Sequence, residues 1–473
     1  MKNKISLLRF LPILFLTVMA TLLSGCIEDG YTSSPDARPV FSKDTVDMGM
    51  VITTDVSTTQ RFTVRNPNSK GIIISDIHVA GENADCFRLN VDGFSGTTFS
   101  DVEIRANDSI YVFVSCTLPE NDMDAPTRVT SDICFTTNGV TERVVVMATG
   151  QDVNRLFGVT IDNDTSFNSG RPYQVFDSLV VAPDVTLTLE AGTSIMFHDR
   201  AYMRVYGTLI TEGTVEHPVE FRGDRTGDVI SGITFDLMAG QWQGVDFMPG
   251  SMGNKLSHTV IRNTVQGIIA EDCDIEIVNS RLRNSQYVAL SAVGCDITAV
   301  GCEFAEAPYG TVYIQGGKAI FDHCTFPNYY LFSAIYGSAV TLAHLNEESA
   351  VEDFDAPYAT VRITNSILYG LGNDIYPGDL TGTDVIVQRC LLKSAGSDDD
   401  NFIECLWESD PLYRTIREDY IFDYRLQPES PAIGAGDSSL STHPAARLDA
   451  YGNPRGETPD LGAYVFTDTG DTD

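Results

Sequence analysis

The segments that decide the fold are six copies of one pattern: LSHTVIRN (256–263), EIVNSRLRN (276–284), TAVGCEFAE (298–306), IFDHCTFPN (320–328), RITNSILYG (362–370) and IVQRCLLKS (386–394). A small residue marks each copy: Thr259, Ser280, Cys302, Cys324, Ser366 and Cys390, at spacings of 21, 22, 22, 42 and 24 residues. The long spacing contains a polar, acidic insertion at 344–358. The repeat is rich in β-branched residues and has no helical period, so it predicts a stacked solenoid of short strands.

Two columns of residues support this geometry. The small residues of the first column are the right size to stack inside a narrow bore. Four residues later a second column carries Asn263, Asn284, Glu306 and Asn328. Because asparagine tolerates left-handed backbone conformations and hydrogen-bonds along a stack, this column predicts a turn with an asparagine ladder.

The first 25 residues have the features of an export signal. A basic start with Lys2, Lys4 and Arg9 precedes an apolar run that is short for a membrane span. The sequence Leu-Ser-Gly-Cys, which ends at Cys26, resembles the lipobox of bacterial lipoproteins. This resemblance implies cleavage before Cys26 and acylation of that residue, with palmitate among the chains, as an anchor in the outer membrane. The alternative is an ordinary secretory signal that happens to be followed by a cysteine.

The residues after Cys26 and the overall charge narrow the location and the partners. The acidic pair Glu28 and Asp29 resembles a surface-export signal of lipoproteins in one Gram-negative lineage, which implies a surface-exposed protein. The formal net charge is −34, and removing the three cations of the leader leaves −37. Such a chain repels phosphate backbones, so we expect no nucleic-acid partner. Strongly anionic polysaccharides are disfavoured for the same reason, unless metal ions intervene.

Composition and punctuation divide the rest of the chain. Residues 26–38 read as a polar tether. Residues 39–151 contain alternating apolar segments at short intervals, which predicts a β-sandwich of seven strands. The elements VDMGMV, FTVRNPNSKGIIISDIHV, NDSIYVFVSC and VVVMATGQ resemble the immunoglobulin-like modules of the ASPM–SPD-2–Hydin type. That resemblance implies a spacer or an interaction module.

Residues 152–407 form the predicted solenoid. The phrases LTLEAGTSIMF, MRVYGTLITEGT and QWQGVDF resemble the first coils of right-handed parallel β-helix proteins. The fold class is therefore all-β: an immunoglobulin-like β-sandwich followed by a right-handed parallel β-helix.

A closing module at 408–466 follows, and a polar tail at 467–473 ends the chain. The closing module carries DPLY, DYRLQPESPAIGAG, DAYGNPRG and PDLGAY, and it resembles the choice-of-anchor-like modules of β-helix surface proteins. We expect it to cap the last coil, with Arg455 paired to Asp449 or Asp460.

Three sets of residues are candidates for chemistry or binding. Arg262 and Arg283 fall at equivalent positions of successive coils, so both would line one face, as a polysaccharide lyase requires for its base and its charge stabilisation. The acids near them in the pattern are Glu271, Asp272, Asp274, Glu303 and Glu306. The alternative is that these arginines and acids form exposed ion pairs. No motif of the inverting polygalacturonase kind is present.

Tyrosines provide the candidate ligand-binding residues. Tyr287, Tyr309, Tyr329 and Tyr330 each precede the first strand of the next coil, so stacked coils would place them along one edge. Tyrosine rings suit the apolar faces of sugars. The alternative is an internal stack that packs over the turns.

One metal site and two classes of function complete the prediction. Asp162 and Asp164 could supply oxygen ligands to calcium near the first coil, and no other cofactor is expected. The chain is then a lipid-anchored, non-catalytic scaffold that binds glycans or cell-surface partners, or else a polysaccharide lyase or glycoside hydrolase acting in a groove. A purely structural stalk is the third alternative. Ionisable residues converging beside the arginines would favour the enzyme, and an aromatic strip would favour binding.

Overall fold

The computed structural model describes residues 30–230, 233–343 and 359–468. The chain separates into two compact units. The first contains residues up to Pro119 together with Arg128–Gly150, and the second contains Glu120–Thr127 and everything from Gln151 onward. The predicted acylation site Cys26 and the insertion 344–358 lie outside the described residues. Among the described residues, no helix has the length and apolar character needed to cross a bilayer.

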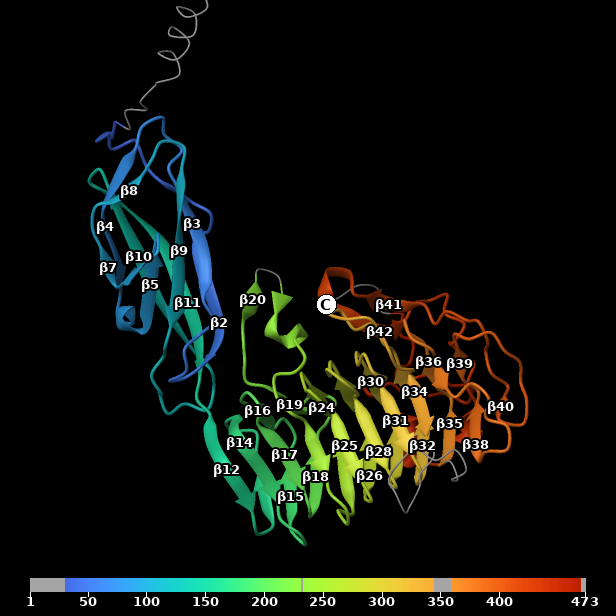
Figure 1. Ribbon diagram of the computed structural model, residues 1–473. Coiled ribbons are helices and arrows are strands. Elements are labelled where there is room, and N and C mark those ends of the chain that lie inside the picture. The colour runs from blue at the N-terminus through green and yellow to red at the C-terminus, as the bar shows by residue number, and fades with distance from the viewer. Residues whose placement is uncertain (1–29, 231–232, 344–358, 469–473) are drawn as a thin grey trace, which may run out of the picture. The chain divides into compact units, whose positions relative to one another are not determined.

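The first unit is a β-sandwich of two antiparallel sheets (Figure 1). One sheet has the order β1 (Val40–Phe41), β3 (Gln60–Arg65), β9 (Ser109–Cys116), β5 (Phe87–Val91) and β6 (Phe94–Gly96). The other has the order β2 (Thr45–Ile52), β11 (Val140–Gln151), β10 (Thr127–Thr137), β4 (Ile72–Ala80) and β7 (Thr98–Phe99), with β8 (Val102–Ile104) also on β4. A short 3-10 helix, η1 (Ala84–Cys86), precedes β5.

The sandwich contains the seven long strands that the alternating segments predict, each of five residues or more. Four further strands of two or three residues, β1, β6, β7 and β8, lie at the sheet edges. Sequence alternation cannot reveal them, because a period of two needs at least four residues to show. In β9 every second residue is buried, which places Ile110, Val112 and Val114 in the core between the sheets.

The segment before the sandwich is not the free tether that its composition predicts. Tyr31 forms a parallel bridge with Gly71. The Asn138 side chain donates hydrogen bonds to the carbonyls of Ser34 and Ala37, and Ala37 is buried in the sandwich core. The prediction of a free tether from polar composition failed because backbone groups take part in these contacts, and composition contains no information on them.

The second unit is a parallel β-helix, whose strands succeed one another along the solenoid in Figure 1. One sheet of 17 strands contains β12 (Asn154–Ile161), β14 (Tyr173–Val181), β16 (Ser194–Phe197), β17 (Tyr202–Val205), β19 (Val219–Gly223), β22 (Val245–Phe247), β24 (Thr259–Arg262), β25 (Ile268–Glu271), β27 (Arg281–Arg283), β28 (Leu290–Val293), β30 (Glu303–Ala305), β31 (Val312–Gln315), β33 (Thr325–Phe326), β34 (Val340–Ala343), β36 (Ile367–Leu368), β37 (Ile375–Tyr376) and β39 (Leu391–Leu392). Its pairings run in two parallel lanes, for example β24–β27–β30 and β25–β28–β31.

A second sheet forms the third side of each coil. Its ten strands are β13 (Thr165–Phe167), β15 (Thr186–Leu189), β18 (Thr208–Glu212), β23 (Asn254–Ser257), β26 (Asp274–Val278), β29 (Asp296–Val300), β32 (Lys318–Asp322), β35 (Thr360–Thr364), β38 (Val385–Gln388) and β40 (Phe402–Ile403). The Cα partners Asp274, Asp296 and Lys318 advance by 22 residues per coil. The repeat read from the sequence is therefore one turn of this solenoid.

The column of small residues lies inside, as predicted: Thr259, Ser280, Cys302, Cys324, Ser366 and Cys390 are at most 1% exposed. Their hydroxyls join neighbouring coils, since the Thr259 amide donates to Ser280 Oγ and the Cys324 amide to Ser366 Oγ, both at 2.9 Å. The residue before each small residue has a positive φ: His258, Asn279, Gly301, His323, Asn365 and Arg389. This bend turns the chain from one sheet into the other.

The predicted asparagine ladder holds at Asn328, whose side chain bonds to the backbone of Ala307 on the neighbouring coil, and is wrong for the two asparagines before it. Asn263, Asn284 and Glu306 do adopt positive φ values. However, the amides of Asn263 and Asn284 donate outward to the carbonyl of Asp236 instead of to one another. Asp236 belongs to η2 (Phe235–Leu237), which follows the hairpin of β20 (Asp228–Ile230) and β21 (Ile233–Thr234). The insertion that contains β20, β21 and η2 therefore accepts hydrogen bonds from Asn263 and Asn284.

The closing module lies along the side of the coils instead of capping the last one. Its strands β41 (Tyr413–Ile416) and β42 (Phe422–Leu426) form an antiparallel pair, accompanied by the 3-10 helices η3 (Glu418–Tyr420), η4 (Ser438–Leu440) and η5 (Pro444–Arg447). Tyr413, Tyr424 and Tyr464 share a core with the coil residues Ala305, Tyr329, Ile367 and Leu391. A lateral position is favourable because it buries large aromatic side chains.

The expected ion pair of Arg455 is also wrong. No nitrogen–oxygen contact within 4.0 Å joins Arg455 to Asp449 or Asp460 in the described chain; its Nη2 donates to the Ala463 carbonyl. Both carboxylates accept backbone N–H groups instead. The charge of Arg455 acts on these acids through space, and burial lowers its pKa to about 10 despite them.

The narrow bore gives the first prediction. Replacing Cys302 by leucine adds volume where the coil walls cannot move apart, so it should destabilise the β-helix by about 1–3 kcal/mol. The substitution Cys302→Ala, which removes the thiol without adding volume, is the control and should cost less. Urea unfolding of the two variants measures the difference, and a Cys302→Leu protein as stable as the alanine variant would contradict the packing.

Candidate functional site

The two arginines of the repeat lie on adjacent coils. Arg262 ends β24, Arg283 ends β27, and they are Cα partners in the parallel register. Arg262 Nη2 lies 2.7 Å from Glu220 Oε1, and its Nη1 lies 3.4 Å from Asp236 Oδ2. Arg283 Nη2 lies 2.6 Å from Glu303 Oε1. Several ionisable groups therefore converge beside the arginines.

Two tyrosines of the closing module complete this network. The Tyr464 hydroxyl donates to Glu303 Oε2 at 2.5 Å, and the Tyr424 hydroxyl bonds to Glu306 Oε1. Glu303 is 1% exposed and Glu306 is 5% exposed. Burying these carboxylates is costly unless each has partners, and the closing module supplies them. The module and the charged network thus stabilise one another.

The environment holds Glu306 in its neutral form near pH 7. Burial raises the pKa of Glu306 to about 8, and the charge of Glu303 adds to that rise. The Arg283 guanidinium and the Tyr424 hydroxyl oppose the shift without cancelling it. For Arg283, burial lowers the pKa but the Glu303 carboxylate outweighs burial, so the guanidinium stays charged. Glu306 is therefore a buried, protonated carboxyl beside the Arg283–Glu303 ion pair.

These residues surround a cavity of about 170 Å³. Arg262, Arg283, Asn284 and Glu306 line it from the coils. Asp236 and Leu237 close it from η2, Tyr330, Leu331 and Phe332 from the turn after β33, and Tyr420 and Phe422 from the closing module. The space is large enough for several waters or one small ring.

The charges around the cavity balance. Arg222, Arg262 and Arg283 face the carboxylates Asp236, Glu220 and Glu303 in direct pairs. With Glu306 neutral, three cations meet three anions. No arginine of this group carries an unmatched charge, although Nε of Arg283 is shielded from solvent and has no hydrogen-bond partner in the described chain. Each of the three arginines on the coil side is thus paired with a carboxylate.

The acids that the sequence places near the arginines are only partly the right ones. Glu303 and Glu306 belong to the network, whereas Glu271, Asp272 and Asp274 lie at the ends of β25 and β26, away from the cavity. Glu220 and Asp236 were missed. The strand register accounts for the position of Glu220, which lies one coil before Arg262 and is the Cα partner of Val260. Asp236 gave no sequence signal, because it lies in an irregular insertion.

The tyrosine strip is the second feature of this surface. Tyr287 and Tyr309 stack with ring centroids 5.3 Å apart, and Tyr309 and Tyr336 lie 5.2 Å apart. The exposed fractions are 45%, 51% and 67% along the strip. Their backbones are bonded, since the Tyr309 amide donates to the Tyr287 carbonyl and the Tyr336 amide to the Pro308 carbonyl. The strip is therefore a fixed, solvent-facing surface.

Two of the four predicted tyrosines do not belong to it. Tyr329 is 6% exposed and packs against Tyr424 and Tyr413. Tyr330 is 7% exposed and lines the cavity. The turn between β33 and β34 is longer than its counterparts, so the strip position falls to Tyr336, 27 residues after Tyr309. The prediction from a constant repeat length therefore chose Tyr329 and Tyr330 in place of Tyr336.

The strip and the cavity are close to one another. Asn284 and Glu306 line the cavity, and Tyr287 and Tyr309 follow each of them by three residues. Three residues of extended chain span at most about 10 Å. The backbone of the strip therefore lies within about 10 Å of two residues that line the cavity.

The proposed calcium ligands are occupied in another way. Asp162 Oδ1 accepts from the Asn163 side chain, and Asp164 Oδ1 accepts from the Thr186 amide at 2.8 Å. The latter bond closes a turn of the first coil. Within the described ranges, no cluster of three or more His, Cys, Asp or Glu side chains is placed to hold a metal ion.

Comparisons with known proteins describe the fold only. No family model matches the chain, and no curated protein matches it. Among solved structures, the catalytic unit of a GH87 α-1,3-glucanase from Streptomyces thermodiastaticus strain HF3-3 is similar at 12% identity and a TM-score of 0.24, covering 73% of this chain and 81% of that one. The PapD-like domain 7 of human CEP192 is similar at 9% identity and a TM-score of 0.18, covering 26% of this chain and 89% of that domain.

A third similarity is to a family 123 glycoside hydrolase of Clostridium perfringens, at 10% identity and a TM-score of 0.18. It covers 24% of this chain, which spans about a quarter of that structure. All three TM-scores lie below 0.5.

The buried acid gives the second prediction. The pKa of Glu306 is higher in the folded protein, at about 8, than in the unfolded chain. The protonated carboxyl therefore stabilises the fold fully below the unfolded pKa, and this stabilisation is lost as the pH rises through about 8. Glutamine keeps the shape of Glu306 without ionising. The Tm of Glu306→Gln should therefore match that of the parent near pH 4.5 and exceed it increasingly up to pH 8. A difference that does not change over this window would show that Glu306 is already ionised.

Proposed function

We propose that this protein binds a neutral glycan chain along the tyrosine strip, with one sugar residue entering the adjoining cavity. The observation that carries the proposal is the exposed stack of Tyr287, Tyr309 and Tyr336. Exposed aromatic rings held at successive coils are costly to leave in water unless a ligand covers them. Such rings pack against the apolar faces of sugars, while their hydroxyls bond to sugar hydroxyls.

The geometry of the strip fits this role. Rings in full face-to-face contact lie about 3.5–4 Å apart. The centroids here are 5.2–5.3 Å apart with interplanar angles of 27° and 31°, so each ring is offset and leaves part of its face uncovered. Because the solenoid backbone holds all three rings, little conformational entropy is lost when a ligand orders them.

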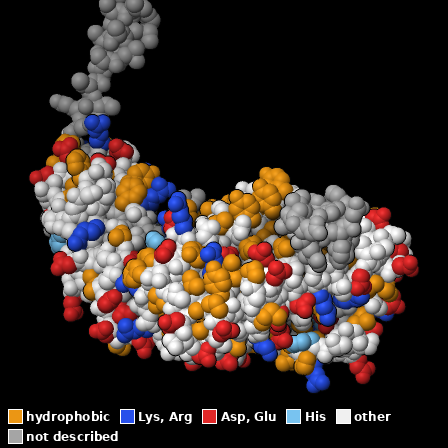
Figure 2. All heavy atoms as spheres, turned by 60° about the horizontal axis from the view of Figure 1, so that its bottom comes forward, with side chains coloured by type: hydrophobic (Ala, Val, Ile, Leu, Met, Phe, Trp, Pro, Cys, Tyr) orange, Lys and Arg blue, Asp and Glu red, His pale blue; other side chains and the backbone are white. Residues whose placement is uncertain are grey.

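Charge selects a neutral ligand. The chain has a formal net charge of −34, and acidic side chains are spread over the face shown in Figure 2 instead of gathering in one patch. The coil arginines beside the cavity are each paired with a carboxylate, so they offset this field little. A uronic or sulfated polysaccharide would meet repulsion at long range and no unmatched arginine at contact.

The cellular setting is part of the proposal. The Leu-Ser-Gly-Cys sequence at Cys26 supports acylation, and an acylated cysteine supports anchoring in the outer membrane with the rest of the chain outside the bilayer. The acidic pair Glu28 and Asp29 supports display on the cell surface. A surface glycan, free or on another cell, is then the partner within reach.

The third prediction tests the strip. The full mature chain is applied to an array of neutral and acidic glycans, and a neutral glycan should bind. The variant Tyr309→Ala removes the central ring and should weaken that binding at least tenfold, or about 1.4 kcal/mol. Tyr111→Ala, which removes an exposed ring of the sandwich, is the matched control and should bind as the parent does. Equal affinity of both variants, or a preference for acidic glycans, would contradict the proposal.

A second function, glycoside hydrolysis, is favoured by one observation: Glu306 is protonated near pH 7 and lines the cavity. A protonated carboxyl donates its proton to the glycosidic oxygen as the bond to the anomeric carbon breaks. A water adds to that carbon and passes its proton to a carboxylate, for which Asp236 is the cavity-lining candidate. Elimination by a lyase is less suited, because it needs unmatched positive charge for a uronic carboxylate.

The fourth prediction separates binding from hydrolysis. A glycan that binds on the array is incubated with the protein, and new reducing ends are measured. If hydrolysis occurs, Glu306→Gln should lower its rate by at least a hundredfold without weakening binding, since the amide donates no proton. Release that persists in Glu306→Gln would exclude this residue as the acid. No release by the parent protein would leave the chain as a binding scaffold.

A further inference from the structure

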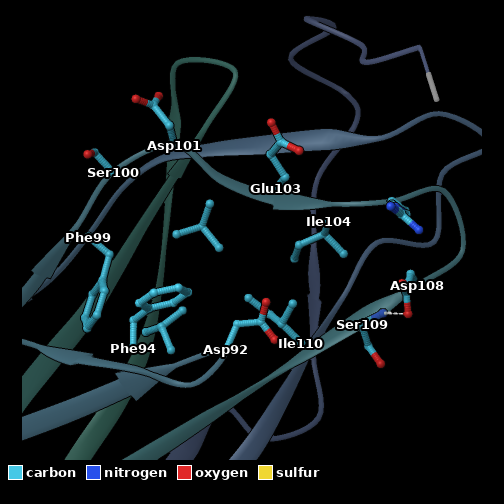
Figure 3. Close-up of a pocket in the computed structure, with 13 residues that line it drawn as sticks. Asp92, Phe94, Phe99, Ser100, Asp101, Glu103, Ile104, Asp108, Ser109 and Ile110 are labelled. Atoms are coloured by element: carbon cyan, nitrogen blue, oxygen red, sulfur yellow. Dashed lines mark hydrogen bonds between the residues drawn. The ribbon is translucent and has the colours of Figure 1, made fainter. Parts of the chain in front are cut away.

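The β-sandwich contains a groove that the glycan proposal does not use. It has a volume of about 630 Å³ and lies between β8, which belongs to one sheet, and the β5–β6 hairpin with the start of β9, which belong to the other (Figure 3). In this region the chain passes from β6 in one sheet to β7 in the other. The two sheets are therefore open to solvent along this edge.

The floor of the groove is apolar. Val91, Ile104 and Ile110 are buried at its base, and Phe99 is half-buried. Phe94 is 73% exposed, although it sits at the opening of an apolar groove. An exposed phenylalanine beside an unfilled apolar floor is an unfavourable arrangement that a ligand side chain would relieve.

The rim of the groove is acidic. Asp92, Asp101, Glu103 and Asp108 line it against one cation, Arg105, and all five residues are exposed. Among the described residues, no ion pair reaches Asp92 or Asp101, while Glu103 accepts a hydrogen bond from the Tyr31 hydroxyl at 2.5 Å. In Figure 3 the carboxylates of Asp101 and Glu103 point away from the apolar floor. A ligand with positive charges outside an apolar centre would match this pattern.

The third feature is an open strand edge. β8 pairs with β4 through Val102, Glu103 and Ile104, and it has no other strand partner among the described residues. An edge strand presents backbone N–H and C=O groups that another extended chain can pair with. Peptides bind many domains in this manner, with main-chain bonds for affinity and pockets for alternate side chains.

We infer that this groove binds an extended peptide segment of another protein, with apolar and basic residues in alternation, as an added strand on β8. Apolar side chains of the peptide fill the space between Phe94, Phe99 and Ile104, and its lysines or arginines face the acidic rim. A second copy of this chain fits poorly, because four carboxylates would face four carboxylates. The sandwich is then a docking module, in addition to any glycan binding by the β-helix.

The test uses the full mature chain and a synthetic peptide of about eight residues in which valine and lysine alternate. The peptide should bind with a dissociation constant below about 1 mM, measured by fluorescence anisotropy. The triple variant Asp92→Asn, Asp101→Asn, Glu103→Gln should weaken binding at least tenfold. Asp44→Asn, which neutralises an exposed acid elsewhere on the sandwich, should not change it. Circular dichroism checks that each variant remains folded.

Two further peptides make the outcome decisive. A peptide of alternating valine and glutamate should not bind, and one with N-methylated backbone amides should bind at least tenfold more weakly, because it cannot pair with β8. Absence of binding by the valine–lysine peptide, or equal binding by the triple variant, would overturn the inference. Equal binding of the N-methylated peptide would overturn strand addition. Self-association of the chain that the triple variant abolishes would assign the groove to a second copy instead.

Discussion

In-register pairing of each coil with the next is the constraint on which the rest of the β-helix depends. Because a coil advances by about 22 residues before it meets its neighbour, residues at that spacing are forced into columns that share one environment. The innermost column must stay small, since the walls are tied by backbone hydrogen bonds and cannot move apart. The same pairing aligns Arg262 with Arg283 and Tyr287 with Tyr309, so both features of the candidate site follow from it.

The cavity also depends on elements that break the repeat. The insertion at β20–β21 contributes Asp236, and the closing module contributes the hydroxyls of Tyr424 and Tyr464. Without these groups Glu303, Glu306 and Arg283 would be buried with incomplete partners, which typically costs 3–5 kcal/mol per broken pair. The network therefore has two consequences: it fixes the closing module to the side of the coils, and it shapes a neutral, polar cavity beside the strip.

Sequence-based prediction succeeds for the features of the repeat and fails for the elements that interrupt it. The period, the small column, the seven long sandwich strands and the place of Arg262 and Arg283 are properties of local pattern, and they could be read from the sequence. Tyr336 could not, because the turn before it is longer than the period, and its counterparts Tyr329 and Tyr330 are buried. Asp236 and the lateral position of the closing module depend on contacts between segments distant in the chain, which no spacing encodes. Tyr31, in the supposed tether, pairs with Gly71 for the same reason.

The central claim is that the strip of Tyr287, Tyr309 and Tyr336 is the glycan-binding surface. The most direct measurement is a crystal structure of the mature chain with a glycan that binds it. We expect sugar rings to lie against these three tyrosines, with one further sugar residue in the cavity between Arg283 and Glu306. A glycan held elsewhere, with the three rings still open to solvent, would contradict it.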